Sequence, residues 1–517
     1  MVLSKHTIVA PAGLGGIIDN RVAARRPPQS PMTGLRNFSR DLLKRLSNPD
    51  SHSLTENLFL RLLGLTYLTA FGSLWPQIIP LFGSHGIVPV ASFLDSLRPE
   101  MKPGLVISIP TVLWFFPADW ALRAACTLGC IASILLIIRW QSRLAAAVCW
   151  VLYLSLVSVG SPFLNFQWDA LLLEAGFLAL FAGSPILVWA YRVLLFRLMF
   201  ESGIVKLSSG DPNWRNLHAL RFHFLTQPLP NPVAYYAYRL PTWLLDSFTL
   251  ATLVIELGAP FLLFFPRRAR YVGVALLILL QVTIILTGNY AFFNLLTLAI
   301  CLWAFDDPVF EPLRPILQRR VSSSTSFRYS NGLRLTGSLA LFFLISVGIA
   351  QILELFDRTF TRRLDANLRW MAPFELVNSY GLFAVMTTTR PEIILQGSND
   401  QIQWLDYNFP YKPGELHRGL PWVAPYQPRL DWQMWFAALG DINENAWVGN
   451  LMYRIMTGDR TTEKLLAPAP FSRPPRYMRA LLYEYRFTTP EVRRRTGAVW
   501  ERTLTRTWFG PVSLTGR

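Results

Sequence analysis

The sequence predicts a polytopic α-helical membrane bundle of roughly eight to ten helices, followed by a β-rich (α+β) soluble C-terminal domain. Two observations support this prediction. Of 517 residues, 52% are hydrophobic and only 16% are charged, which is too apolar for an ordinary soluble protein. Long apolar runs fill the chain up to about residue 357, and short β-prone segments replace them after residue 360. We therefore expect two structural regions in different solvents.

The chain begins with an arginine-rich stretch, residues 1–56, which lacks the apolar core and small-residue cleavage site of a signal peptide. We interpret it as a basic, partly disordered cytosolic tail. The transmembrane helical domain then covers 57–357, and the β-rich C-terminal domain covers 358–517. The formal charge of +17 comes from basic residues between apolar runs, which orient membrane helices, so we expect no nucleic-acid partner.

The membrane helices are predicted from runs that approach the 20 or so apolar residues needed to cross a bilayer. These runs contain no period-two alternation, so helices and not a barrel satisfy the backbone. The best candidates are 58–80, 121–138, 144–160, 243–265, 271–287 and 335–356, and shorter ones are 105–118, 170–183, 186–206 and 291–305.

Basic residues at 267–270 and 314–328 flank a pair of predicted spans, so both groups are expected to be cytosolic. The span before them then starts outside, which places a polar loop at 207–242 on the extracytoplasmic side. The last span carries the chain out again. We therefore expect this loop and the C-terminal domain to share the lumenal, periplasmic or exterior side.

The C-terminal domain has β-prone stretches and few helical patterns. A turn sequence at 397–400 separates two of these stretches and predicts a hairpin. Asp431 is a plausible N-cap of a helix over 432–439. The predicted strands are Phe383–Thr387, Glu392–Gln396, Ile402–Tyr407, Tyr477–Thr488 and Trp500–Trp508.

Several ionisable residues stand inside apolar runs. Arg197 and Glu201 are four apart on one helix face, where each neutralises the other as an intramembrane charge pair. Glu174 needs a partner of opposite charge, either Arg192 or Arg197. Glu256 also needs a partner. Structural pairing and interfacial placement are weighted above a transport path, and no internal repeat of the transporter type is evident.

The loop begins with Asp211–Pro212, an N-cap followed by proline, which predicts a short helix from Asn213 to about Leu225. Its aromatic residues suggest an element at the membrane surface, either a plain connector or a recognition element. His218 and His223 are five apart and therefore face different ways, with no acidic or thiol ligand to complete a set. No metal site is predicted there.

No catalytic constellation is recognisable. The sequence has neither H-E-x-x-H, G-x-S-x-G nor a P-loop, and its four cysteines lie in apolar runs without a C-x-x-C pair. We therefore expect no enzyme activity and no cofactor. The buried carboxylates keep open an alternative, a membrane enzyme acting on a lipid or quinone-like substrate.

Long ordered blocks of the sequence resemble the lipase maturation factor family. The resemblance runs from about residue 57 to the end of the chain, and it is specific because the blocks are uncommon. They are Phe166–Asp169 with Leu172–Gly176, Ser202–Leu220, Thr226–Pro232, Gly288–Asn294, Gly397–Asp400 with Trp404, Tyr411–Gly414 and Ala424–Phe436.

This resemblance implies a membrane-anchored factor that assists the folding or assembly of secreted lipases or other exported proteins. It also implies partners among exported client proteins and membrane lipids. The location would be the endoplasmic reticulum membrane in a eukaryote, or the inner or plasma membrane in a bacterium. The membrane half is more distantly similar to the vitamin K-dependent carboxylases, which sustains the enzyme alternative.

If the chain is such a factor, the loop and the C-terminal helix are the first places to look for client recognition. The residues predicted for this role are Trp214, Arg215, His218, Arg429, Asp431, Trp432 and Trp435. Trp432 and Trp435 are three apart, a spacing that more often indicates core packing than a binding face.

Overall fold

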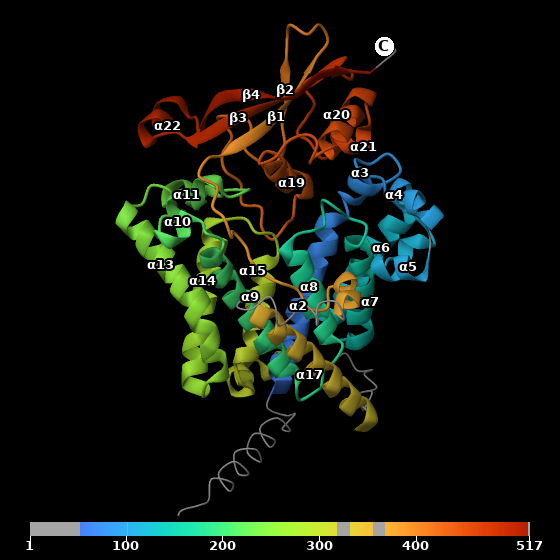
Figure 1. Cartoon of the computed structure of the whole chain (residues 1–517), viewed down its shortest axis with the longest axis vertical. Coiled ribbons are helices and arrows are strands. Elements are labelled where there is room, and N and C mark those ends of the chain that lie inside the picture. The colour runs from blue at the N-terminus through green and yellow to red at the C-terminus, as the bar shows by residue number, and fades with distance from the viewer. Residues whose placement is uncertain (1–51, 101, 318–330, 355–367, 515–517) are drawn as a thin grey trace, which may run out of the picture. The chain divides into compact units, whose positions relative to one another are not determined.

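The computed structural model describes residues 52–100, 102–317, 331–354 and 368–514. Most of the predicted N-terminal tail, 1–56, and the predicted boundary at 357/358 lie outside these residues. A bundle of helices extends from Ser53 to Glu354, and a four-stranded sheet with short helices follows in the last part of the chain (Figure 1). The predicted fold class is confirmed.

The main helices of the bundle agree with the predicted runs to within a few residues, except at 105–118. They are α2 (Ser53–Leu74), α6 (Asp119–Ile137), α7 (Ser142–Val157), α8 (Gln167–Ala179), α9 (Leu187–Ser208), α13 (Thr242–Gly258) with η4 (Ala259–Phe264), α14 (Arg267–Thr287), α15 (Phe293–Cys301) with η5 (Leu302–Ala304), and α17 (Asn331–Glu354). The 105–118 run instead contains only the ends of short turns, α5 (Pro103–Ser108) and η3 (Val112–Trp114).

Among the described residues, five helices are long and apolar enough to cross a membrane: α2, α6, α13 with η4, α14 and α17. The count becomes six if the bent pair Phe293–Ala304 and Asp307–Leu317 is one span. This is fewer than the roughly eight to ten expected. The helices α7 and α8 are too short, and α9 has four charged residues in its 22.

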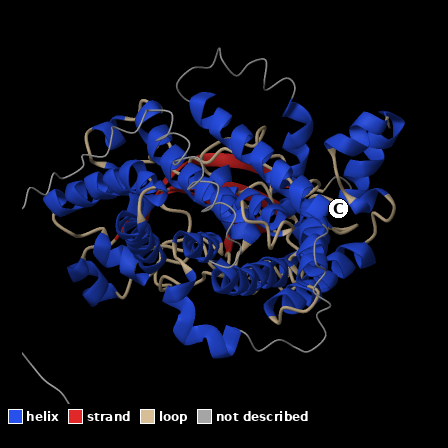
Figure 2. Ribbon diagram, turned by 90° about the horizontal axis from the view of Figure 1, so that it is seen from below, coloured by secondary structure: helices blue, strands red, loops and turns tan. Residues whose placement is uncertain are grey.

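Helix α2 forms the centre of the bundle. It is 56% buried over its apolar window, whereas α14 and α17 are each 28% buried and expose Leu and Phe side chains. Helices with one exposed apolar face are suited to contact lipid. Figure 2 views several of these helices almost end-on, with the strands behind them.

Short helices connect the longer ones at both ends of the bundle. They are α3 (Ile78–Phe82), α4 (Val90–Leu97), η2 (Arg98–Glu100), α10 (Pro212–Arg215), α11 (Ala219–Thr226), α12 (Pro232–Ala237), η6 (Asp307–Leu313) and α16 (Arg314–Leu317). The loop helix predicted from 213 to 225 is therefore split into α10 and α11. Leu217, with φ of 63°, breaks it in the left-handed region that non-glycine residues seldom adopt.

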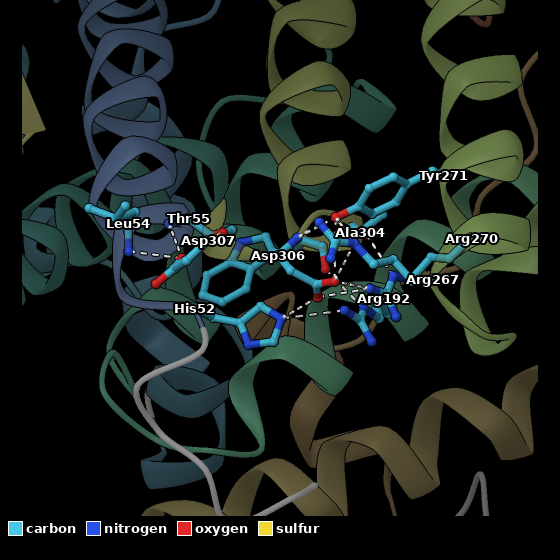
Figure 3. Close-up of polar contacts among 11 residues, drawn as sticks. His52, Leu54, Thr55, Arg192, Arg267, Arg270, Tyr271, Ala304, Asp306 and Asp307 are labelled. Atoms are coloured by element: carbon cyan, nitrogen blue, oxygen red, sulfur yellow. Dashed lines mark hydrogen bonds and ion pairs between the residues drawn. The ribbon is translucent and has the colours of Figure 1, made fainter. Parts of the chain in front are cut away.

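Asp306 and Asp307 join the starts of α2 and α14 at one end of the bundle (Figure 3). Asp307 Oδ1 accepts hydrogen bonds from the backbone N–H groups of Leu54 and Thr55, both at 3.0 Å, and so caps α2 from a distant part of the chain. Both carboxylate oxygens of Asp306 lie 2.7 Å from Arg270 Nη2. Arg270, one of the basic residues expected to face the cytosol, is thus anchored here.

The C-terminal sheet is antiparallel, with the strand order β2-β1-β3-β4. Its strands are β1 (Pro391–Ser398), β2 (Leu405–Tyr407), β3 (Tyr477–Phe487) and β4 (Trp500–Ser513), and the accompanying helices are η7 (Arg369–Phe374), α19 (Arg429–Ala437), α20 (Trp447–Thr457), α21 (Arg460–Glu463) and α22 (Pro490–Thr496). The predicted hairpin is present, since β1 pairs with β2.

Two local predictions for this domain are wrong. Residues 383–387 form no strand, because Phe383 has φ of 55°, its carbonyl accepts from Trp214 Nε1, and Met386 N donates to Asp211 Oδ2 in the helical loop. Asp431 does not cap its own helix, which begins two residues earlier at Arg429. Its Oδ1 instead accepts from the backbone N–H groups of Tyr411 and Lys412, both at 2.8 Å.

Candidate functional site at the junction of bundle and C-terminal domain

The C-terminal domain is joined to the bundle through helix α19. Arg429, at its first position, is fully buried and directs Nη1 and Nη2 to the two carboxylate oxygens of Asp169 on α8, at 2.7 and 2.9 Å. Arg429 Nη2 also lies 3.1 Å from the Tyr153 hydroxyl. A planar guanidinium paired with a carboxylate in this way fixes both distance and orientation. The helix is therefore held in one position against the bundle.

The rest of α19 continues this contact. The Trp432 ring packs edge-on against Trp168 of α8, with ring centroids 4.8 Å apart. Trp435 Nε1 donates to the carbonyl of Thr226 at the end of α11, at 2.9 Å. Both indoles are almost fully buried. These two tryptophans are core residues of the junction, as their spacing suggested.

The same junction includes an arginine that the sequence analysis did not single out. Arg390 precedes β1, is fully buried, and donates to the carbonyls of Leu225, Gln227 and Pro228 at 2.6 to 2.9 Å. It also forms an ion pair with Glu392 at 2.8 Å. A charged pair beside an apolar strand, Arg-Pro-Glu-Ile-Ile-Leu, is the signal that could have identified it. Arg390 therefore fastens the end of α11 to the sheet.

Two side-chain amides complete the junction. Asn289 Nδ2 donates to the carbonyls of Leu229 and Pro421, each at 3.0 Å, and its Oδ1 accepts from Val423 N at 2.8 Å. Gln77, just after α2, bridges the segment before α19 in the same manner, with Oε1 accepting from Arg429 N at 2.8 Å. Buried side-chain amides that hydrogen-bond to irregular backbone are costly to replace, because their loss leaves backbone N–H and C=O groups without partners.

The intramembrane carboxylates hold a second connection, the returning segment, which we define as residues 376–386. Glu174 Oε2 accepts from the backbone N–H of Asn378 and from the hydroxyl of Tyr380, both at 2.8 Å. Glu201 Oε2 accepts from the backbone N–H of Tyr380 at 2.8 Å. Irregular backbone beside membrane helices needs such internal partners, since lipid offers none.

Arg197 neutralises both carboxylates. Its Nη1 lies 2.6 Å from Glu174 and its Nε lies 3.3 Å from Glu201, and it also donates to the carbonyl of Asn378. All three charged side chains are at most 4% exposed. The partner of Glu174 is Arg197, while Glu256 pairs with Lys206 at 2.8 Å. These contacts give the charges a structural role.

The three loop residues predicted for recognition have different environments. Trp214 is buried and donates from Nε1 to the carbonyl of Phe383 at 2.8 Å. Arg215 is exposed and donates to the carbonyl of Leu207 at the end of α9. His218 is half-buried and precedes α11. Of the seven predicted recognition residues, Arg215 is the most accessible to a partner.

Asp431 joins two parts of the C-terminal domain itself. Burial raises the pKa of its carboxyl to about 6, and the two N–H groups from Tyr411 and Lys412 oppose that rise. No group of three or more His, Cys, Asp or Glu within the described ranges is arranged to hold a metal ion. The junction thus combines buried ion pairs, amides and tryptophans, which connect two regions and position a sheet.

The sheet presents an accessible edge beyond this junction. Strand β4 lies at one side of the sheet, and Thr503–Thr507 are exposed on both faces. Throughout the described part of the chain, no further strand pairs with this edge. The opposite edge strand, β2, has three residues. A long exposed edge is able to pair with an extended segment of another protein.

Comparisons with known proteins agree with the two-part architecture. The family model of the lipase maturation factor transmembrane domain matches residues 54–312, and that of the lipase maturation factor C-terminal domain matches residues 376–510. The matched ranges include both sides of the junction. No solved structure matches the chain.

Curated relatives match over most of their own length as well. The chain is 34% identical to lipase maturation factor 1 of Bos taurus, over 89% of each protein. It is 34% identical to lipase maturation factor 1 of Homo sapiens, covering 89% of this chain and 88% of the relative. It is 33% identical to lipase maturation factor 2 of Xenopus laevis, covering 84% and 79%. These relatives are named as maturation factors, so the alternative of a lipid or quinone enzyme gains no support from them.

The bundle of apolar helices, the antiparallel sheet fastened to it and the matches on both sides of the junction lead to one conclusion. This protein is a multi-pass membrane protein that belongs to the lipase maturation factor family.

Proposed function

We propose that this protein is a membrane-anchored maturation factor that acts without catalysis on an exported client, a secreted lipase in the first instance. The observation that supports this most strongly is the pair of family matches, which extends over both the bundle and the C-terminal domain. The expected location is the endoplasmic reticulum membrane, or the inner or plasma membrane in a bacterium. The extracytoplasmic side is the one on which an exported client would meet the sheet.

The client contact that we propose is strand addition at β4. An incompletely folded client has unpaired backbone groups in extended segments, and the free edge at Thr503–Thr507 offers matching donors and acceptors. The junction residues Arg429 and Trp432 are buried, so they support this contact by positioning the sheet. Arg215, the exposed loop residue, is a second candidate for direct contact.

A test uses cells that lack their own lipase maturation factor and secrete a lipase together with this protein. The expected result is a higher specific activity, measured as lipase activity per secreted lipase antigen, than in cells with an empty vector. Equal specific activities for several lipases would contradict a lipase client. Adding the protein after secretion serves as the control, because maturation must precede export.

The strand-addition contact is tested with Thr505→Pro. Thr505 is the extra residue at a bulge between β3 and β4 and has no partner residue in β3, so proline is tolerated there by the fold. Proline removes one backbone donor from β4 and restricts its pairing with a client strand, so the gain in lipase specific activity should fall. The matched control is Thr505→Val, which keeps the N–H and favours a strand. If both variants support maturation equally, the client binds elsewhere.

A further inference from the structure

A cavity of about 120 Å³ lies in the bundle, away from the sheet edge proposed to receive a client. Residues of α9, α10, α11, α13, α14 and α15 surround it, together with Leu382 and Phe383 of the returning segment. Most of its wall is apolar, with Leu280, Phe224 and Phe293 among the lining side chains. Neither the junction nor the returning segment needs this space for its hydrogen bonds.

The cavity reaches the outer surface of the bundle between α13 and α14. Thr283 of α14 lines it and is exposed, and Thr252 of α13 lines it and is half-buried. Both hydroxyls donate to carbonyls of their own helices, Thr283 to Leu279 and Thr252 to Phe248, at 2.9 Å. Their methyl groups are then available to an apolar chain. The neighbouring outward residues Val254 and Leu279 are 60% and 58% exposed, as on a surface that contacts lipid.

The inner end of the cavity contains an ion pair that is satisfied by the protein. Lys206 Nζ lies 2.8 and 2.9 Å from the two carboxylate oxygens of Glu256 and donates to the carbonyl of Ser202 at 3.1 Å. The three protons of the ammonium group therefore all have partners. The charges cancel, so the pair attracts neither an anionic nor a cationic headgroup.

His223, at the same end of the cavity, has an unused hydrogen-bond acceptor. The hydroxyl proton of Tyr290 goes to Gln227 Oε1 at 3.1 Å, so the 3.0 Å contact between that hydroxyl and His223 Nε2 requires His223 to donate. A neutral imidazole that donates from Nε2 accepts at Nδ1. No partner for Nδ1 occurs among the residues that the structure describes. Burial, with the Lys206 charge, lowers the pKa of His223 to about 4, so the ring is neutral at pH 7.

We propose that this cavity binds a neutral lipid with a free hydroxyl, of the acylglycerol or long-chain alcohol class. The acyl chain would extend between α13 and α14 toward the bilayer, and the hydroxyl would donate to His223 Nδ1. An anionic fatty acid is disfavoured, because the ammonium group of Lys206 that lines the cavity is already neutralised by Glu256. This site goes beyond the proposed maturation function and does not depend on it.

The test uses a 1-monoacylglycerol with a diazirine in its acyl chain as the photocrosslinking probe, with the full-length protein in lipid nanodiscs. Crosslinked peptides identified by mass spectrometry should come from the segments that line the cavity, 252–256 and 280–287. Unlabelled monoacylglycerol should compete more effectively than the fatty acid of the same chain length. Competition that is equal for both, or stronger for the fatty acid, would overturn the assignment of a neutral headgroup.

Two substitutions on α14 distinguish binding in the cavity from contact with the lipid-facing surface of the bundle. Leu280→Trp fills the cavity, because Leu280 is buried in its wall, and should reduce specific labelling. The matched control is Val272→Trp, which places the same bulk on an exposed position of α14 about three turns from the opening at Thr283 and should leave labelling unchanged. Equal labelling of both variants would show that the probe only samples the lipid-facing surface.

Two further variants keep the result decisive if Leu280→Trp does not fold. Thr283→Trp obstructs the opening from an exposed position and should reduce labelling in the same way. His223→Phe removes the acceptor, and the affinity for monoacylglycerol should weaken about fivefold, the loss expected for one net hydrogen bond. If labelling persists in Thr283→Trp and the affinity is unchanged in His223→Phe, the proposal is wrong.

Discussion

Arg429 shows how much one residue contributes to the junction. Its charge is fully buried and its guanidinium contacts Asp169, Tyr153 and the carbonyl of Phe163. Such a pair adds little over well-packed apolar residues, but removing one partner leaves the other charge buried and alone. This ion pair therefore fixes the position of α19 more than it adds to the stability of the fold.

The Arg429→Met variant should therefore lose about 3–5 kcal/mol in its free energy of unfolding, because Asp169 loses its counter-charge. Unfolding in mixed detergent micelles measures this loss. The control is Arg486→Met, which removes an arginine that is 67% exposed and paired with Glu484, and which should cost less than about 1 kcal/mol. Equal losses in the two variants would show that the contact with Asp169 does not hold the junction.

Asp431 should give the C-terminal domain a specific dependence on pH. Its pKa is about 6 in the folded protein, above its ordinary value of 3.8. The folded state therefore holds the proton more tightly than the unfolded state does. The resulting stabilisation is complete below about pH 4 and is lost as the pH rises through about 6, by up to about 3 kcal/mol.

The measurement compares the wild type with Asp431→Asn, whose side-chain oxygen still accepts from Tyr411 and Lys412. The wild type should gain stability relative to Asp431→Asn as the pH falls from 6 to 4. A difference that is constant across this range would mean that the buried carboxyl keeps its ordinary pKa.

At the scale of elements, the returning segment depends on side chains of α8 and α9. In the Glu174→Ala variant, the N–H of Asn378 and the hydroxyl of Tyr380 lose their acceptor, and Arg197 loses one counter-charge. We expect the amides of 376–386 to exchange hydrogen faster by about tenfold or more, since such a loss costs at least about 1.4 kcal/mol. Hydrogen exchange with mass spectrometry measures it.

The conservative control for this element is Tyr380→Phe, which removes one hydrogen bond and leaves all the charges paired. Its exchange should increase much less than that of Glu174→Ala. If hydrogen exchange in both variants equals that of the wild type, the returning segment is held by packing and not by the carboxylate of Glu174.

Elements with a strong local signal could be predicted from the sequence, and long-range partners could not. The helices α6, α13 and α14 agree with the predicted apolar runs, and β1 with β2 forms the predicted hairpin. Arg429 and Asp169 are 260 residues apart, so nothing local indicates that they meet. Charged residues are normally assigned to the surface, which is why Arg390 with Glu392 was missed.

At the scale of the whole molecule, the loop at 207–242 and the C-terminal domain lie together at one end of the bundle. Tyr235 of α12 donates to the carbonyl of Thr488 after β3, and Trp214 contacts the returning segment. Basic residues such as Arg270 lie with the start of α2, at the other end. Which end faces the cytosol stays a prediction from the distribution of basic residues.

Cysteine labelling in sealed, right-side-out vesicles tests that prediction. In a chain whose four own cysteines are replaced by alanine, Thr503→Cys should react with a membrane-impermeant maleimide from outside. Arg268→Cys, also at an exposed position, should react only after the vesicles are opened. The reverse pattern would invert the orientation, and with it the side on which a client is met.

The hydrogen bonds of Arg390 constrain the order in which contacts form during synthesis. The carbonyls of Leu225 and Gln227 are synthesised about 165 residues before the arginine that binds them. At typical synthesis rates this interval is roughly 10–30 s, during which the end of α11 has no partner from the sheet. The contact between the end of α11 and the sheet therefore forms late in synthesis, and a C-terminal domain produced alone would lack the loop carbonyls to which Arg390 donates.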